Sequence, residues 1–118
     1  MNSEEILELV VKAADSKLAV DMMALDVREI SLLADYFVIT HGHSERQINA
    51  IVDEVVDKAK ENGVEIKQVE GRGGKWILID LKDVIVHIFT EEERSYYNLE
   101  KLWFDAPLVD LNSMVTQA

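Results

Sequence analysis

The chain has 118 residues and a net charge of −11, because its 23 acidic residues outnumber its 12 basic residues. A chain of this length predicts one domain with an ordinary hydrophobic core. The lack of cysteine excludes disulfides, thiol catalysis and thiolate zinc sites, and it fits a reducing compartment. The acidic balance argues against direct nucleic-acid binding, since that affinity depends largely on Lys and Arg side chains that neutralise phosphates.

The sequence predicts no membrane contact. The N-terminal residues are acidic where a signal peptide would be basic, and no apolar run approaches the roughly 18 residues of a spanning helix. We therefore expect a cytoplasmic protein without a membrane partner. The acidity favours a basic protein as partner, although solubility alone would also account for it.

The first half of the chain predicts a helix and then two strands. Ser3 is placed to cap a helix whose first turn is acidic, which suits the positive end of the helix dipole. A strand follows at about 20–27. Residues 29–34 predict a short irregular or helical link into a second strand at 36–40.

The clearest helix begins after Ser44, which forms a predicted capping box with Gln47, and it stops at Gly63. Its apolar residues recur at helical spacing, so they predict a single buried face. These residues are Ile48, Ile51, Val52, Val55, Val56 and Ala59.

The second half predicts a third strand at 64–69, a glycine-rich loop at 70–75, and a hairpin. The hairpin strands, 76–80 and 84–89, are joined by the two-residue turn Lys82-Asp83. A two-residue turn fixes the register of the pairing, because side chains alternate between the two faces with a period of two.

The two faces of this hairpin differ in character. One is wholly apolar and belongs against a core. The other mixes aromatic, acidic and titratable groups, with Asp80 and His87 as diagonal neighbours placed for a hydrogen bond, and with Trp76 either covered by the last helix or exposed as an interface anchor. The apolar pairs are Leu81 with Val84, Ile79 with Val86 and Ile77 with Ile88; the mixed pairs are Asp80 with Ile85, Leu78 with His87 and Trp76 with Phe89.

A last helix begins at a second predicted capping box, Thr90 with Glu93, and ends before 105–107. Strands interspersed with helices at this spacing predict an α/β fold with a mixed five-stranded sheet flanked by helices. We assign residues 1–107 to a single α/β domain and 108–118 to a loosely held C-terminal tail.

Three motifs of the second half lie close together in a fixed order: WILID at 76–80, VHIF at 86–89 and YYNLEKLW at 96–103. With two further motifs upstream, ADYFVI and SERQ, this order resembles the bacterial ribosomal silencing factor family, also called Iojap-like. The resemblance extends from residue 5 to residue 107. Family members commonly have Gly-Asp where this chain has the turn Lys82-Asp83, and a small residue in place of His41.

The resemblance implies a fold similar to the nucleotidyltransferase core and a translation repressor that is not an enzyme and needs no cofactor. Family members bind large-subunit ribosomal protein fourteen and thereby prevent the ribosomal subunits from joining. An acidic chain suits such a basic partner, since complementary charge speeds association. A homodimer through the same hairpin face, and a regulator of some other basic protein, stay open. We expect partner contacts from Lys75, Trp76, Leu78, Asp80, His87 and Tyr97, with Trp76 first.

A small nucleotidyltransferase-like enzyme that uses Asp80, Asp83 and His87 is the alternative from another class. Two-metal nucleotidyl transfer needs two carboxylates on one face, which a strand supplies as D-x-D, whereas Asp80 and Asp83 straddle the turn. The loop at 71–74 lacks the Walker pattern and joins two strands. The HGH sequence at 41–43 has no nearby third ligand and predicts a polar loop. We therefore expect no catalytic residues and no metal.

Overall fold

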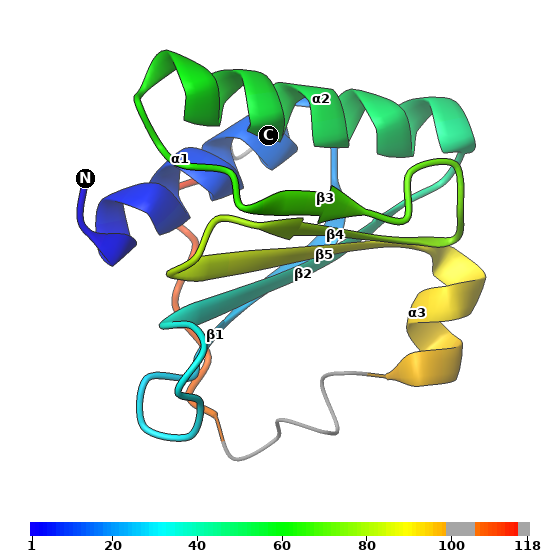
Figure 1. Ribbon diagram of the computed structural model, residues 1–118. Coiled ribbons are helices and arrows are strands. Elements are labelled where there is room, and N and C mark those ends of the chain that lie inside the picture. Colours follow the sequence, from blue (N-terminus) through cyan, green and yellow to red (C-terminus); the bar gives the residue numbers. More distant parts are fainter. Residues whose placement is uncertain (99–105, 116–118) are drawn as a thin grey trace.

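A computed structural model describes residues 1–98 and 106–115 of the chain (Figure 1). No helix within these ranges is both long enough and apolar enough to cross a membrane. In chain order the elements are α1 (Ser3–Ser16), β1 (Val20–Asp26), β2 (Tyr36–Gly42), α2 (Glu45–Glu61), β3 (Gln68–Glu70), β4 (Trp76–Asp80), β5 (Val84–Thr90) and α3 (Glu91–Tyr97).

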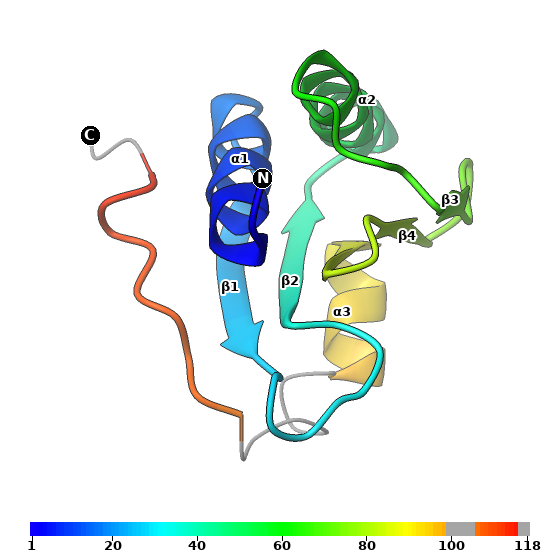
Figure 2. The ribbon, with the colours of Figure 1, turned by 60° about the vertical axis from the view of Figure 1, so that its left-hand side comes forward.

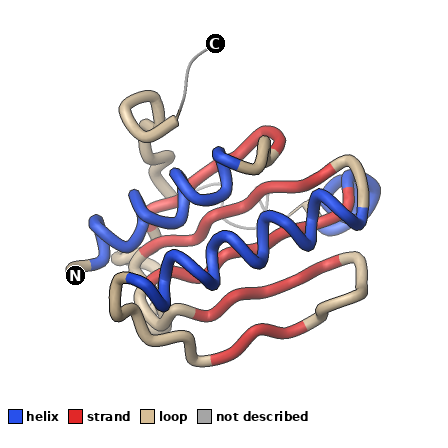
Figure 3. Tube along the Cα trace, turned by 90° about the horizontal axis from the view of Figure 1, so that it is seen from above, coloured by secondary structure: helices blue, strands red, loops and turns tan. Residues whose placement is uncertain are grey.

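The five strands form one sheet in the order β1-β2-β5-β4-β3. β2 and β5 run parallel, and the other neighbouring pairs are antiparallel. α1 and α2 lie side by side over one face of the sheet, as the view from above in Figure 3 shows. α3 follows β5 and lies on the side away from α1 and α2 (Figure 1). The predicted α/β fold with a mixed five-stranded sheet is confirmed.

The main core fills the space between the sheet and the two long helices. All six apolar residues that the sequence placed on one face of the second helix are buried in α2. α1 adds three neighbouring pairs of buried residues, and the apolar face of the hairpin forms the opposite wall of the core. The largest of these side chains that are fully buried include Leu7, Val10, Val11, Ile51, Ile77, Ile79 and Ile88.

The start of α1 differs from the prediction by one residue. Asn2, not Ser3, caps the helix: Asn2 Oδ1 accepts from Glu5 N (2.8 Å), and Glu5 Oε1 accepts from Asn2 N (3.0 Å). A cap at Ser3 would place Ile6 three residues further on, and Ile6 has no group that could complete a reciprocal box. The residue pair that satisfies both main-chain donors therefore sets the first turn.

Ser44 caps α2 as predicted, but the reciprocal half of the predicted capping box does not form, because the Gln47 side chain has other partners. Gln47 N donates to Ser44 Oγ (3.1 Å), whereas Gln47 Oε1 accepts from His43 N (2.7 Å). Gln47 Nε2 donates to the main-chain oxygens of Lys17 (3.3 Å) and Leu18 (2.8 Å). The glutamine thus fastens the first turn of α2 to the turn between α1 and β1.

β3 covers Gln68–Glu70 and is shorter than the predicted strand at 64–69. It pairs with β4 only from Leu78 to Asp80, where β4 ends at the hairpin turn. The preceding residues run past the end of β4 and form one further bond, from Lys67 N to Asp80 O (2.8 Å). Because strand pairing needs a partner of matching length, the apolar alternation alone overestimated this strand.

α3 also ends earlier than predicted. Thr90 caps it by accepting from Glu93 N (3.3 Å), which confirms the predicted cap residue. The helix stops at Tyr97, because Asn98 takes a left-handed conformation (φ 49°) and its N–H donates to Arg94 O (2.9 Å). Asn is one of the few residues that tolerate this conformation at a helix end. The rest of the predicted helix lies outside the described residues.

The chain after Pro107 runs along the outer edge of β1 (Figure 2). Asp26 N donates to Pro107 O (2.9 Å), and Val109 N donates to Ala24 O (2.9 Å). Several side chains of this segment, from Val109 to Val115, pack against the main core. The division into a domain ending at residue 107 and a loosely held tail stays a prediction.

Candidate partner-binding face

The hairpin of β4 and β5 has the predicted register. Trp76 pairs with Phe89, Leu78 with His87 and so on along both strands. The turn closes with Leu81 N donating to Val84 O (3.0 Å). The apolar pairs face α1 and α2 and are fully buried. The opposite side chains therefore emerge on the other side of the sheet.

We call this second surface the mixed face; its hairpin members are Trp76, Leu78, Asp80, Ile85, His87 and Phe89. Phe89 is 1% exposed, and it belongs to a second buried cluster with Phe37 and Ile39 of β2. Trp76 is half-buried and packs against that cluster from its margin. Trp76 is thus partly packed on the core and partly exposed, so its position fits both predicted alternatives, core residue and surface anchor.

A hydrogen bond and ring stacking orient the indole of Trp76. Trp76 Nε1 donates to His87 Nδ1 (3.2 Å) across the two strands. The ring centroids of Trp76 and Phe89 are 5.0 Å apart and stacked, and Phe37 meets the ring of His87 edge-on at 5.4 Å. Aromatic pairs at these distances are favourable in both geometries. These contacts therefore fix the orientation of a large apolar ring.

His87 is neutral at neutral pH. It is 7% exposed, and burial lowers its pKa to about 4. Because Nδ1 accepts the indole N–H, the ring proton must sit on Nε2. Nε2 is buried and has no hydrogen-bond partner among the described residues. An orphaned buried donor is rare in proteins and costs stability.

The predicted hydrogen bond between Asp80 and His87 is wrong. Asp80 Oδ1 accepts instead from Lys82 N (2.8 Å) in the hairpin turn. Asp80 is the last residue of β4, so the turn offers it a main-chain donor two residues away, whereas His87 turns its Nδ1 toward Trp76. Local hydrogen bonds of this kind are common for Asp.

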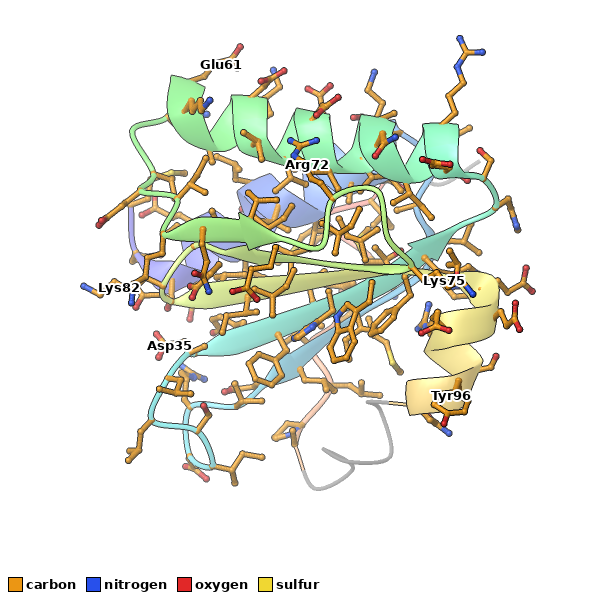
Figure 4. The ribbon with its side chains drawn as sticks, turned by 45° about the vertical axis from the view of Figure 1, so that its right-hand side comes forward. Asp35, Glu61, Arg72, Lys75, Lys82 and Tyr96 are labelled. Carbon is orange, nitrogen blue, oxygen red and sulfur yellow. The ribbon has the colours of Figure 1, made fainter. Side chains whose placement is uncertain are left out.

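The glycine-rich loop folds back onto the main chain of Trp76. Gly71 has φ 85°, and a Cβ there would lie 2.2 Å from Trp76 O, so only glycine fits. An open hollow of about 330 Å³ lies beside it, lined by Glu70, Gly71, Trp76 and Leu78. Lys75 lies near α3, at the end of the sheet opposite Lys82, as Figure 4 shows. Trp76 and Leu78 thus border an open recess.

Of the remaining predicted contacts, Tyr97 is the last residue of α3, and its side chain lies outside the described part of the structure. Its neighbour Tyr96 is 79% exposed. Lys75 is exposed, and Leu78 and Asp80 are half-buried. The assignment of these residues to a partner interface stays a prediction.

Sequence reasoning missed a link between α3 and the sheet. Arg94 Nη1 lies 2.9 Å from His41 Nδ1 and donates to Val20 O (3.2 Å). Burial, followed by the nearby Arg94 charge, lowers the pKa of His41. Phe37 was also missed, although the alternation of β2 places it on the same face as Ile39. The strand period could have found Phe37, but no local pattern joins Arg94 to His41.

The residues of the alternative enzyme do not converge. Asp80 is engaged with the turn, Asp83 lies within that turn, and His87 is paired with Trp76. Across the parts of the chain that the structure describes, no group of three or more His, Asp or Glu side chains could hold a metal ion. What the fold and the mixed face define is a small α/β protein in which one half-buried tryptophan packs on a buried aromatic cluster of the sheet.

Comparison with known proteins identifies the family within this class. Residues 1–118 match the family described as ribosomal silencing factor during starvation, and the chain belongs to it. It is 52% identical over 118 residues to the ribosomal silencing factor RsfS of Bacillus subtilis, covering 99% of this chain and all of that protein. The RsfS of Halalkalibacterium halodurans is 50% identical over 117 residues, 98% of this chain and 100% of that one.

Solved structures agree with the fold. A crystal structure of a Bacillus halodurans protein superimposes with a TM-score of 0.82 at 50% identity, covering 92% of this chain and 99% of that one. A Chromobacterium violaceum protein superimposes with a TM-score of 0.86 at 35% identity, covering 88% of each chain. The resemblance to ribosomal silencing factors that the motifs indicated is therefore confirmed.

Proposed function

We propose that this ribosomal silencing factor binds large-subunit ribosomal protein fourteen through the mixed face and sterically blocks the joining of the two ribosomal subunits. The observation that carries the proposal is the state of Trp76: half-buried, hydrogen-bonded to His87 and stacked on Phe89 beside an open hollow. Fixed aromatic side chains at the centre of a surface are the usual anchors of protein interfaces.

The charge distribution supports a basic protein as partner. The chain carries 23 acidic and 12 basic residues, and the first turn of α3, which follows β5 directly, alone has three glutamates. Opposite charge on a ribosomal protein would speed association and discriminate among partners. Naked RNA would bind poorly, because the same carboxylates repel phosphates. The protein acts in the cytoplasm as a repressor of translation, without catalysis or a cofactor.

The proposed contacts are Lys75, Trp76, Leu78, Asp80, His87 and Tyr97. Trp76 is the expected anchor, Leu78 adds apolar area on the same face, and Lys75 extends the surface toward α3 (Figure 4). His87 contributes indirectly through the orientation of the indole. This division of roles assigns most of the binding energy to one side chain, as hot spots generally do.

The mechanism is tested by adding the protein to separated ribosomal subunits and measuring the yield of joined ribosomes in a sedimentation gradient. The yield should fall in proportion to occupancy of the large subunit, with no nucleotide present. The matched control is Trp76→Ala at the same concentration, which should leave joining unchanged. Unchanged joining when wild-type protein saturates the large subunits would refute steric blocking.

The partner is tested separately by asking which isolated subunit carries the protein through the gradient. We expect the protein with large subunits and not with small ones. Binding to purified ribosomal protein fourteen should reproduce this affinity. Binding to small subunits, or to ribosomal RNA stripped of protein, would contradict the assignment.

A further inference from the structure

The loop between β1 and β2, residues 27–35, has a fixed shape that does not depend on burying its own apolar side chains. Its two ends are joined, with Val27 N donating to Asp35 O (2.9 Å). Inside it, the main-chain nitrogens of Ile30 and Ser31 both donate to Val27 O (3.1 and 2.8 Å). Asp35 N donates to Asp83 O (2.8 Å), which anchors the loop to the hairpin turn. Compact loops with closed ends are frequently functional.

This closed loop presents its apolar residues to solvent. Leu32 is 105% exposed, Leu33 81% and Ile30 49%. Single exposed apolar residues are normal on protein surfaces, but several together at the tip of an ordered loop mark an interaction site. Neither leucine contributes to either buried cluster. Packing of the fold therefore does not require apolar residues at these two positions.

The charged residues near Leu32 and Leu33 indicate the chemistry of the partner surface that the two leucines would contact. Arg28 is occupied, since it holds Asp26 through two hydrogen bonds (2.9 and 2.6 Å) and lies 5.4 Å from the ring centre of Tyr36. Glu29 and Asp35 have no ion-pair partner within the described ranges. An apolar tip between carboxylates fits an apolar recess with a basic rim. A second copy of this acidic chain would bring like charges together.

The loop lies on the side of the sheet that also carries Trp76. Figure 1 shows the loop below the sheet, away from α1 and α2. The mixed face is on this same side of the sheet. The molecule measures 33 × 33 × 32 Å, and an ordinary interface buries about 800 Å² on each partner. One partner can therefore cover both the mixed face and the loop.

We propose that Leu32 and Leu33 form a second apolar contact of the protein with the large ribosomal subunit, entering a recess with a basic rim. This inference rests on the proposed function, because it assumes that the mixed face meets the large subunit. The ordered loop then provides a second point of contact, which fixes the orientation of the protein on its partner. Because the loop is already ordered, little conformational entropy is lost on binding.

The experiment compares Leu32→Ser/Leu33→Ser with wild-type protein in binding to purified large subunits. The double variant should bind more weakly by roughly tenfold or more, because two apolar side chains no longer leave water on binding. Its melting temperature should stay unchanged, since both side chains are exposed. The comparison variant is Leu18→Ser: Leu18 is 77% exposed and lies at the other end of the strands, the end that carries Trp76. The loss of affinity should be larger for the loop variant than for Leu18→Ser.

A second variant tests the basic rim. Glu29→Gln/Asp35→Asn keeps the loop's main-chain hydrogen bonds and removes two negative charges. Association with large subunits should slow, and the dependence of the rate on salt should become shallower. An unchanged rate and salt dependence would contradict the basic rim.

The remaining outcomes are distinct. If wild-type protein binds large subunits and Leu32→Ser/Leu33→Ser binds equally well, the loop contact is wrong while the proposed function stands. If wild-type protein does not bind large subunits, the proposed function fails and the loop contact with it. If the leucine variant instead abolishes self-association of the free protein, the loop is an interface between copies, and the contact with the ribosome is again wrong.

Discussion

The two faces of the β4–β5 hairpin are made by alternate residues of the same strands, yet they have different roles. Facing α1 and α2, Ile77, Ile79, Val86 and Ile88 are at most 1% exposed and contain no polar side-chain atom. On the mixed face, Trp76 is half-buried and joined by a hydrogen bond to a buried histidine. The first face stabilises the fold, and the second is the face that we propose to bind a partner. Substitutions on the two faces should therefore separate stability from binding.

The largest effect is expected on the covered face. Ile79→Ala should lower the free energy of unfolding by about 2–5 kcal/mol, because it removes fully buried methyl groups and leaves a cavity. Urea denaturation measures this loss. The affinity of the folded fraction for large subunits should equal that of wild-type protein. A weaker affinity of the folded fraction would show that the two faces are not independent.

The next effect concerns the buried histidine of the mixed face. The pKa of His87 is about 4 in the folded chain and about 6.5 when unfolded. Between these values the unfolded chain binds more protons, so the free energy of unfolding falls as the pH is lowered through this window. The total loss is about 3 kcal/mol.

Measuring the free energy of unfolding against pH for His87→Gln should show a shallower fall over the same window. His41→Gln is the control, because the pKa of His41 is also lowered and its contribution must be subtracted. Curves for wild-type and His87→Gln that run parallel between pH 6.5 and 4 would mean that His87 titrates normally.

A smaller change in stability, but a large one in affinity, is expected at Trp76. Trp76→Ala should cost about 2 kcal/mol or more in binding to large subunits, the scale of an interface hot spot. The loss of folding stability should be smaller than for Ile79→Ala. Trp76→Phe is the matched variant, since it retains a ring that can stack on Phe89 but lacks the N–H that reaches His87. A large drop in melting temperature with unchanged affinity of the folded fraction would place Trp76 in the core.

The smallest effect is expected at the turn that joins the two strands. Lys82 has φ 74°, a left-handed conformation that is costly for any residue with a Cβ. Lys82→Gly should raise the free energy of unfolding by about 0.5–1 kcal/mol, the strain relieved minus the extra chain entropy of glycine. Asp83→Gly is the control and should destabilise the protein, because Asp83 has no positive φ. A loss of stability in Lys82→Gly would show that its side chain makes a contact worth more than the strain.

Sequence reasoning succeeded where a local rule decides the outcome. The hairpin register follows from a two-residue turn, and the buried face of α2 follows from the helical period. The resemblance also showed that this chain departs at Lys82-Asp83 from a pattern that commonly has glycine, and the positive φ of Lys82 gives that glycine a physical reason.

The failures arose where the apolar pattern of a segment does not decide the structure. Asp80 could accept a hydrogen bond from either His87 or Lys82 N, and it accepts from Lys82 N in the turn. The length of β3 depends on where β4 ends. The end of α3 depends on a single left-handed residue, Asn98, in a stretch with good helical periodicity. The periodicity of apolar residues contains none of this information.

The parallel pair at the centre of the sheet has a consequence for how the chain acquires its structure. Tyr36 of β2 lies beside Val84 of β5, so this pair joins segments separated by α2, β3 and β4. Such non-local pairing forms late, because the entropy of closing the intervening loop is lost first. During synthesis, β1, β2 and both long helices emerge while the inner edge of β2 still lacks its neighbour. We expect this edge to be the site most exposed to misassociation until residue 90, the end of β5, has left the ribosome.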